Sequence, residues 1–229
     1  MRSHFLYLNY PLSLRIVDYN SFPAFEGYNG AAIRMNLSHQ QQDVLLDLAR
    51  DSIRRALADE PAPPLPPDPQ LNQPAGCFVS LHRMFDHRLR GCVGRLDAKT
   101  GLAQTVSTMA QGVLEDPRFL TSLVTTEELS ELEIELSILS PLMKLARPEE
   151  FDPAASGVYI TYGGRNGCFL PQVARDTGWN REQLLDRLCT EKLGLPPDTW
   201  RKEGATIYRF TALLVGPEPF MKLHQWTLL

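Results

Sequence analysis

The sequence lacks long apolar runs, metal-ligand spacing and an excess of positive charge. None of its apolar stretches approaches the roughly 20 residues of a membrane-spanning helix. The formal net charge of -4 argues against general binding to duplex DNA. The four cysteines, Cys77, Cys92, Cys168 and Cys189, form no CxxC or CxxxH pattern, which argues against a zinc site or a thioredoxin-type motif. We therefore expect a cytoplasmic protein with reduced cysteines, without a metal or cofactor and without a membrane partner.

The first residues of the chain are aromatic but have no helix or strand period. Proline, asparagine and arginine interrupt the apolar run that a signal peptide would need. We interpret residues 1–34 as a poorly ordered extension and expect residues 35–229 to form the folded domain. Met35 stands just before the first helix signal, so translation starts either at Met1 or at Met35. The alternative is a segment that docks its aromatic side chains on the body of the protein.

An amphipathic helix is predicted over residues 38–59. Ser38 and Gln41 have the spacing of a capping box, and apolar residues then recur at helical spacing against a charged face. Six prolines between positions 61 and 69 end the helix and predict an extended connector. We interpret it as a spacer, although such a stretch can also bind an aromatic groove.

The rest of the chain contains one pattern twice. Residues 76–140 predict a strand, a turn, a second strand, a helix and a further strand, and residues 157–215 repeat this order. The last strand of the second copy is predicted over residues 206–215. The short turns within each pair exclude parallel crossovers. The pattern therefore predicts an α+β fold of two lobes with largely antiparallel sheets.

The stretch LRGCVG at residues 89–94 has the most unusual composition. As a strand it places Arg90, Cys92 and Gly94 on one face. Two glycines in a short strand indicate a bulge or a close approach by ligand or backbone, and nearby arginines favour a thiolate. One interpretation is a reactive Cys92, partly accessible and with a lowered pKa. The other is a buried cysteine whose neighbouring glycines serve packing alone.

A second candidate surface is the strand predicted over residues 131–138, which Pro141 ends. Glu131, Glu133 and Glu135 alternate with apolar residues, so the strand has one wet or cleft-facing side. The carboxylates suit either acid–base chemistry or a solvated face. Arg118 follows Asp116 and Pro117 at a helix end, and we expect it to be structural or to line a cleft rather than to be catalytic.

Four stretches together carry a family resemblance: LRGCVG, DPRF at 116–119, LEIELSILSP at 132–141 and YGGRNGCFLPQVARDTGW at 162–179. Over about residues 37–215 the chain resembles the AMMECR domain family. The resemblance implies two α+β lobes with LRGCVG beside the cleft between them, and it implies no settled activity. Prokaryotic members resemble the first component of the AmmeMemoRadiSam system, which implies a Memo-like protein and a radical S-adenosylmethionine enzyme as partners.

Two functions are consistent with these features. The first is an enzyme, or a subunit of one, in which Cys92 is the nucleophile, Arg90 holds an anionic group or the thiolate, and His82 is the base. The second is a non-enzymatic binding or adaptor module whose LRGCVG cleft binds an anionic ligand or a protein partner. The further candidate binding residues, most of them implied by the resemblance, are Leu89, Gly91, Gly94, Arg118, Glu135, Arg165 and Gln172.

Overall fold

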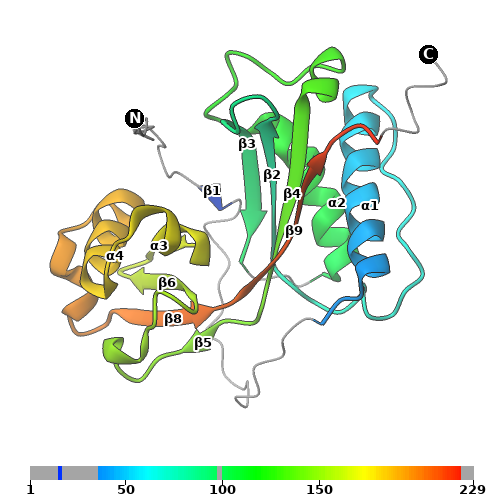
Figure 1. Cartoon of the computed structure of the whole chain (residues 1–229). Helices are drawn as coiled ribbons and strands as arrows, with labels where there is room; N and C mark the ends of the chain where they lie inside the picture. The colour runs from blue at the N-terminus through cyan, green and yellow to red at the C-terminus, as the bar shows by residue number, and fades with distance from the viewer. Residues whose placement is uncertain (1–14, 17–35, 97–99, 223–229) are drawn as a thin grey trace, which may run out of the picture.

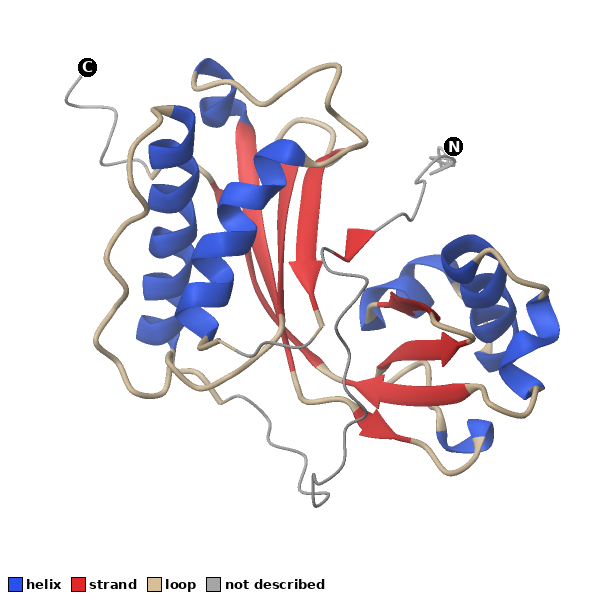
Figure 2. Ribbon diagram, turned by 180° about the vertical axis from the view of Figure 1, so that it is seen from behind, coloured by secondary structure: helices blue, strands red, loops and turns tan. Residues whose placement is uncertain are grey.

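Two lobes make up the part of the chain that this computed structural model describes, residues 15–16, 36–96 and 100–222 (Figure 1). In the first lobe, helices cover one face of a five-stranded sheet, and in the second lobe helices pack on a four-stranded sheet (Figure 2). Described strand pairs are antiparallel, apart from one two-residue parallel pair. The predicted α+β class, with its repeated strand–turn–strand–helix–strand order, is confirmed.

The first sheet has the order β1-β3-β2-β4-β9. Its strands are β1 (Arg15–Ile16), β2 (Cys77–Arg83), β3 (Leu89–Arg95), β4 (Leu132–Leu139) and β9 (Ala212–Pro219), and its helices are α1 (His39–Leu57) and α2 (Leu102–Gly112). Alternate side chains of β2 and β4, such as Val79 and Leu136, point toward the helices and are fully buried. Because the side-chain period of a strand is two, the polar residues between them point to the opposite face.

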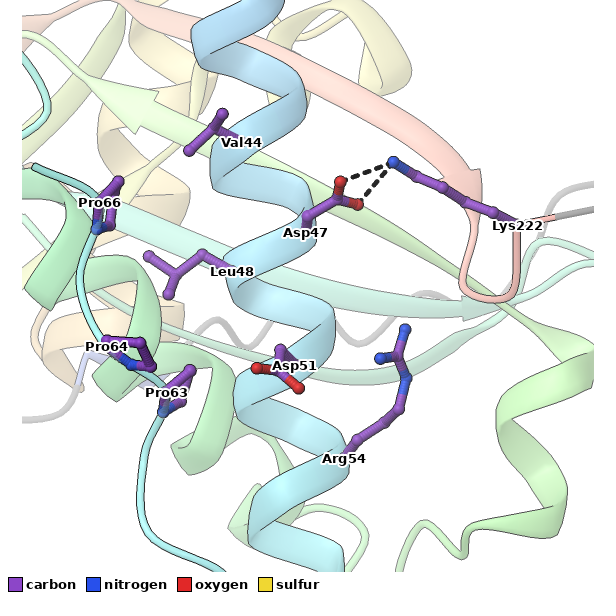
Figure 3. Close-up of a pocket in the computed structure, with 9 residues that line it drawn as sticks. All are labelled: Val44, Asp47, Leu48, Asp51, Arg54, Pro63, Pro64, Pro66 and Lys222. Atoms are coloured by element: carbon purple, nitrogen blue, oxygen red, sulfur yellow. Dashed lines mark hydrogen bonds and ion pairs between the residues drawn. The ribbon is translucent and has the colours of Figure 1, made fainter. Parts of the chain in front are cut away.

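Helix α1 begins at the predicted capping box. The Ser38 hydroxyl accepts a hydrogen bond from the Gln41 amide, and the Gln41 side chain accepts one from the Ser38 amide. Beyond the helix, the proline-rich connector passes along α1 and leaves a groove of about 440 Å3 (Figure 3). Lys222 lines this groove and forms an ion pair with Asp47 at 2.6 Å. None of the site residues predicted from the sequence lines the groove.

The second sheet has the order β5-β8-β6-β7. Its strands are β5 (Met143–Lys144), β6 (Gly157–Tyr162), β7 (Arg165–Phe169) and β8 (Thr206–Phe210). Gly163 and Gly164 both have positive φ, as the tight turn between β6 and β7 requires. Helix α3 (Pro171–Thr177) is followed by α4 (Arg181–Leu188), which continues into the π-helical turn η4 (Cys189–Leu193). The described 3-10 turns are η1 (Val113–Glu115), η2 (Glu127–Glu131), η3 (Pro148–Glu150) and η5 (Pro197–Arg201).

The chain crosses between the lobes twice. It leaves the first sheet after Leu139 and returns at Ala212, so β9 belongs to the first sheet although it follows the second lobe. At the crossing, the Ser140 amide donates to the Thr211 carbonyl, and the Thr211 amide donates to the Ser140 hydroxyl, both at 2.9 Å. The predicted single strand over residues 206–215 is therefore wrong. These hydrogen bonds hold the chain where it divides into β8 and β9, which pair in different sheets.

Apolar side chains from both lobes fill the junction. We call the following eight buried residues the junction cluster: Phe78, Cys92, Leu96, Leu139, Tyr159, Cys168, Leu170 and Phe210. Each lobe has its own larger core besides this cluster. The junction cluster therefore fixes the face of the first sheet that is turned away from α1 and α2 against the second lobe.

The predicted N-terminal extension lies outside the described residues, apart from two positions. Arg15 and Ile16 form β1, which pairs in parallel with Val93 and Gly94 of β3. The choice between Met1 and Met35 as the start also falls outside the described part. No helix in the described residues is both long and apolar enough to span a membrane.

Candidate functional site

The sheet face that meets the second lobe carries polar side chains in register across three strands. Cys92 of β3 lies opposite Ser80 of β2, and Ser80 lies opposite Glu135 of β4. His82 and Glu133 pair in the adjacent row. We call these five residues the inter-lobe face.

Contacts with the second lobe place this face at the junction. Cys92 packs in the same cluster as Cys168 of β7. Gln172 of α3 donates a hydrogen bond to the hydroxyl of Ser137, which follows Glu135 on the same side of β4. The residues expected beside a cleft therefore lie where the two lobes meet.

Cys92, the predicted nucleophile, is buried. Only 2% of its surface is exposed, and the Ser80 hydroxyl donates a hydrogen bond to its Sγ at 3.0 Å. Burial raises the pKa of the Cys92 thiol to about 12, and the Ser80 hydrogen bond and the Arg118 charge offset only part of this effect. The prediction of an accessible thiol with a lowered pKa is therefore wrong, because desolvation outweighs the positive charge nearby. At neutral pH the thiol is protonated and is a poor nucleophile.

Neighbouring side chains occupy the space beside the glycines of the LRGCVG motif. A Cβ on Gly91 would lie 3.0 Å from Val113, at the end of α2, and one on Gly94 would lie 2.2 Å from the Phe78 ring. Leu89 is half-buried against the junction cluster. The glycines thus allow close packing on both sides of β3 and leave no open space beside the thiol.

The arginine of the motif does not serve the thiol. The pairing of β2 with β3 shifts register between Leu81 and His82, which leaves Arg90 as the extra residue of a β-bulge. Its guanidinium binds both carboxylate oxygens of Glu128, at 2.6 and 2.9 Å, and the Ser122 carbonyl at 2.7 Å. Strand alternation predicted the wrong partner because the bulge breaks the period. Arg90 instead holds the segment that leads into β4.

Arg118 is the cation that contacts the Cys92 backbone. Its Nη2 donates to the Cys92 carbonyl at 3.1 Å, and its guanidinium binds the carboxylate of Asp116 through Nε and Nη2. The same Asp116 carboxylate accepts the Cys92 amide at 2.8 Å. Asp116 is 1% exposed. These contacts are those of a structural residue that clamps the centre of β3.

His82 is half-buried on the inter-lobe face. Burial lowers the pKa of its imidazole, although the Glu133 carboxylate opposes this effect. Glu133 in turn contacts His87 Nδ1 at 2.7 Å, and this hydrogen bond raises the pKa of His87. No hydrogen bond joins His82 to Cys92 in the described structure, where the thiol's hydroxyl neighbour is Ser80. The structure therefore does not place His82 as the base of this thiol.

Glu135 is the half-buried carboxyl at the other end of the row. Burial raises its pKa, the carboxylates of Glu133 and Asp176 raise it further, and Arg175 opposes them. Asp176 and Arg175 belong to α3, so the second lobe acts directly on this group. Perturbed carboxyl and imidazole groups on one face are typical of binding and catalytic sites.

Gln172 lines a hollow of about 180 Å3 between α3 and β9. Its Nε2 donates to the Ser137 hydroxyl at 3.2 Å, while its Oε1 is buried without a hydrogen-bond partner. Arg175 lines the same hollow. Gln172, a motif position of the family, therefore lies at the junction together with the inter-lobe face.

The other motif arginine has a different role. Arg165 Nη1 donates to the carbonyls of Leu193 and Gly194, at 2.9 and 3.1 Å, and so binds the end of turn η4. Gly167 lets the same turn approach β7, since a Cβ there would lie 2.4 Å from Lys192 Cβ. Sequence reasoning missed Lys192. The motif residues Arg165 and Gly167, which both contact this turn, were the sequence feature that could have pointed to it.

The structure thus gathers Cys92, His82, Glu135 and Gln172 at the junction, while Arg90 and Arg165 bind carboxylate or carbonyl groups of their own lobes. Among the residues that the structure describes, no group of three His, Cys, Asp or Glu side chains is arranged to hold a metal ion. The arrangement suits the binding of a polar group better than attack by the thiol.

Comparison with known proteins agrees with the motifs. The AMMECR1 family model matches residues 46–215. Protein MJ0810 of Methanocaldococcus jannaschii is 40% identical over 149 residues, 62% of this chain and 73% of that protein. Protein PH0010 of Pyrococcus horikoshii is 34% identical over 187 residues, 77% of this chain and 89% of that protein.

The fold also matches a solved structure. The crystal structure of PH0010 superimposes with a TM-score of 0.72 at 32% sequence identity, covering 78% of this chain and 92% of that chain. Family model, sequence and fold agree over the same two lobes, and the chain belongs to the AMMECR1 family.

Proposed function

We propose that this chain is a binding module whose inter-lobe face recognises a ligand or a protein partner, without a reaction at cysteine. The burial of Cys92 carries this proposal. A thiol that is 2% exposed and has a pKa of about 12 offers neither access nor a thiolate.

The alternative, a cysteine-dependent modifying enzyme, lacks two further features that such chemistry uses. The predicted base, His82, has no hydrogen bond to the thiol in the described structure, and the predicted anion holder, Arg90, is occupied by Glu128. Activation of a nucleophile requires a base within hydrogen-bond reach. The polar groups beside the thiol are instead suited to hydrogen bonding with a bound molecule.

As partners we propose the Memo-like protein and the radical S-adenosylmethionine enzyme of the AmmeMemoRadiSam system. Membership of the AMMECR1 family supports this choice, since the resemblance implies those partners. The inter-lobe face offers them half-buried polar groups from both lobes, at Glu135 and Gln172.

The proposal is tested with each purified partner by titration calorimetry. Cys92→Ser is expected to bind within about twofold of the wild type, because serine keeps the hydrogen bond to Ser80. Glu135→Gln is expected to weaken binding about tenfold, since it replaces the half-buried carboxyl group of the face with an amide. Glu131→Gln, an exposed carboxylate just before β4, is the matched control and is expected to bind normally.

Two results would overturn the proposal. Loss of cellular function in folded Cys92→Ser, with partner binding intact, would show that the thiol does chemistry. Failure of both partners to bind the wild-type chain would reject the binding function as proposed.

A further inference from the structure

Lys192 is a half-buried cation without a carboxylate partner in the described structure. Its Nζ lies 5.5 Å from the centroid of the Phe169 ring, and no ion pair or hydrogen bond of its side chain occurs among the described residues. The arginines of the neighbouring β3 region differ, because Arg90 binds Glu128 and Arg118 binds Asp116. An unpaired cation that has lost part of its hydration is costly unless something else compensates for it.

The second family motif holds Lys192 in this position. Gly167 admits the lysine stem against β7, because a Cβ there would lie 2.4 Å from Lys192 Cβ. Arg165 fixes the end of the turn through the carbonyls of Leu193 and Gly194. The turn itself is π-helical, a rare geometry that often occurs at functional sites. Arg165 and Gly167 together therefore hold Lys192 in its position.

The surroundings of Lys192 come from both lobes and carry little compensating charge. Arg118 and Cys92 of the first lobe and Cys168 of the second lie close enough to influence its protonation. Both thiols are buried and protonated at neutral pH. Its neighbour Glu191 is the nearby carboxylate, and it forms an ion pair with Arg187 at 3.0 Å.

We propose that Lys192 binds the oxyanion of a ligand, a carboxylate or phosphate group, at the boundary between β3 and β7. This inference rests on the proposed binding function and names one ligand group for it. The ammonium supplies a charge-assisted hydrogen bond to the anion, while Arg118 on the opposite lobe remains bound to Asp116.

The protonation of Lys192 supports the same conclusion. Burial is the main cause that lowers the pKa of its amine to about 8, and Arg118 acts in the same direction, while the Glu191 carboxylate acts in the opposite direction. A bound anion stabilises the ammonium, so binding raises the pKa and removes the fraction of free amine.

Competitive labelling of the full-length wild-type chain tests this directly. The lysines are modified with phenyl isothiocyanate at pH 8 and constant ionic strength, with sodium phosphate or sodium acetate replacing chloride, and the rates are read by peptide mass analysis. At an anion concentration about ten times its Kd, labelling of Lys192 is expected to fall about tenfold. Lys202, an exposed lysine 3.9 Å from Asp198, is the internal control and should keep its rate. The two salts distinguish a phosphate site from a carboxylate site.

A variant series separates this inference from the proposed function. In thermal unfolding, saturable stabilisation by the protecting anion is expected in the wild type and in Lys202→Met, and not in Lys192→Met. Lys192→Arg, which keeps the positive charge, should retain part of the stabilisation by the anion. Unchanged Lys192 labelling in both anions overturns the inference. Normal partner binding by Lys192→Met would reject the role of Lys192 in partner binding and would leave the proposed binding function standing. Anion protection without partner binding would support the anion site at Lys192 and would reject the proposed partners.

Discussion

The solvation of a single thiol decides between the two functions considered for this chain. Cys92 lies under the second lobe, and its pKa of about 12 leaves almost no thiolate at neutral pH. Cys77 and Cys168 are also buried, and burial raises the pKa of both thiols. The three cysteines should therefore react with a thiol reagent at similarly low rates in the folded protein.

We expect iodoacetamide at pH 7 to alkylate Cys92 in the folded protein as slowly as Cys77 and Cys168. The rates are measured by peptide mass analysis, and all three thiols should react quickly after unfolding in guanidinium chloride. An alkylation rate of Cys92 well above the other two in the native protein would contradict a buried, protonated thiol. It would support the alternative hypothesis that Cys92 is a nucleophile.

The carboxylate of Asp116 depends on Arg118 in the same region. Burial opposes its charge, but hydrogen bonds from Arg118 and from the Cys92 amide lower the pKa of Asp116 overall. A carboxyl whose pKa is lower in the folded state stabilises the fold above its unfolded pKa, and this stabilisation is lost as the pH falls through the folded value. The ion pair should therefore contribute at neutral pH and disappear in acid.

Arg118→Ala is expected to lower the free energy of unfolding by about 2 to 3 kcal/mol at pH 7, because it leaves a buried carboxylate without its cation. Urea unfolding at pH 7 and at pH 3 measures the difference. The cost should shrink at pH 3, where Asp116 in the variant is protonated. Arg147→Ala, a 77% exposed side chain, is the control and should change stability little.

Among the secondary-structure elements, turn η4 packs against β7 at a position where β7 has no side chain. Gly167 has no room for a Cβ, whereas the nearest atom to a Cβ on Gly112, at the end of α2, is 3.5 Å away. Gly112 also has a helical φ of -63°. The two glycines therefore predict opposite responses to the same substitution.

Gly167→Ala is expected to destabilise the protein by about 1 to 3 kcal/mol, because η4 must move away from β7. Gly112→Ala should be neutral or should stabilise the protein by up to about 1 kcal/mol, since alanine is the better helix residue. Thermal unfolding of both variants measures the contrast. Equal effects would mean that the approach of Lys192 to β7 is not tight.

Strand β1 adds only two residue pairs to the edge of β3. We therefore expect removal of residues 1–34 to change Tm by no more than about 1 to 2 °C, the scale of surface changes. Differential scanning calorimetry of the full and shortened chains measures this. A drop of about 5 °C or more would instead favour aromatic docking on the body.

Local sequence signals predicted most of the elements because they depend on neighbours in the chain. The capping box predicted at Ser38 is present, and the box at Asn180, the glycine turn before β7 and the αL residue Gly194 are features of the same local kind. The glycines of LRGCVG indicated a bulge or a close approach, but they did not show that Arg90 is the extra residue, because its position follows from pairing with β2 rather than from the strand's own period. Register is a property of two strands, and one strand's alternation does not contain it.

At the scale of the whole molecule, the junction cluster joins two lobes that each have a separate core. Its burial of Cys92 could not be read from the sequence, because the covering residues Tyr159, Cys168 and Phe210 follow far along the chain. The composition of LRGCVG is equally compatible with an open and a covered strand. Only the packing of the second lobe decides between them.

Phe210→Ala is expected to destabilise the protein by about 3 to 5 kcal/mol and to loosen both lobes, since this side chain is 2% exposed in the junction cluster. Native-state hydrogen exchange should show faster amides in β2 as well as in β6. Phe151→Ala, in the core of the second lobe alone, is the comparison and should accelerate β6 preferentially. Protection of β2 that is unchanged in Phe210→Ala would mean that the lobes open independently.

The crossing at Ser140 and Thr211 also sets the order in which the protein is completed on the ribosome. Strand β9 is synthesised last and belongs to the first sheet, so β4 remains an edge strand while the second lobe is translated. At roughly 5 to 20 residues per second this lasts for several seconds, during which the backbone groups of β4 are open to other nascent chains. The lobe that begins first is therefore the lobe that closes last.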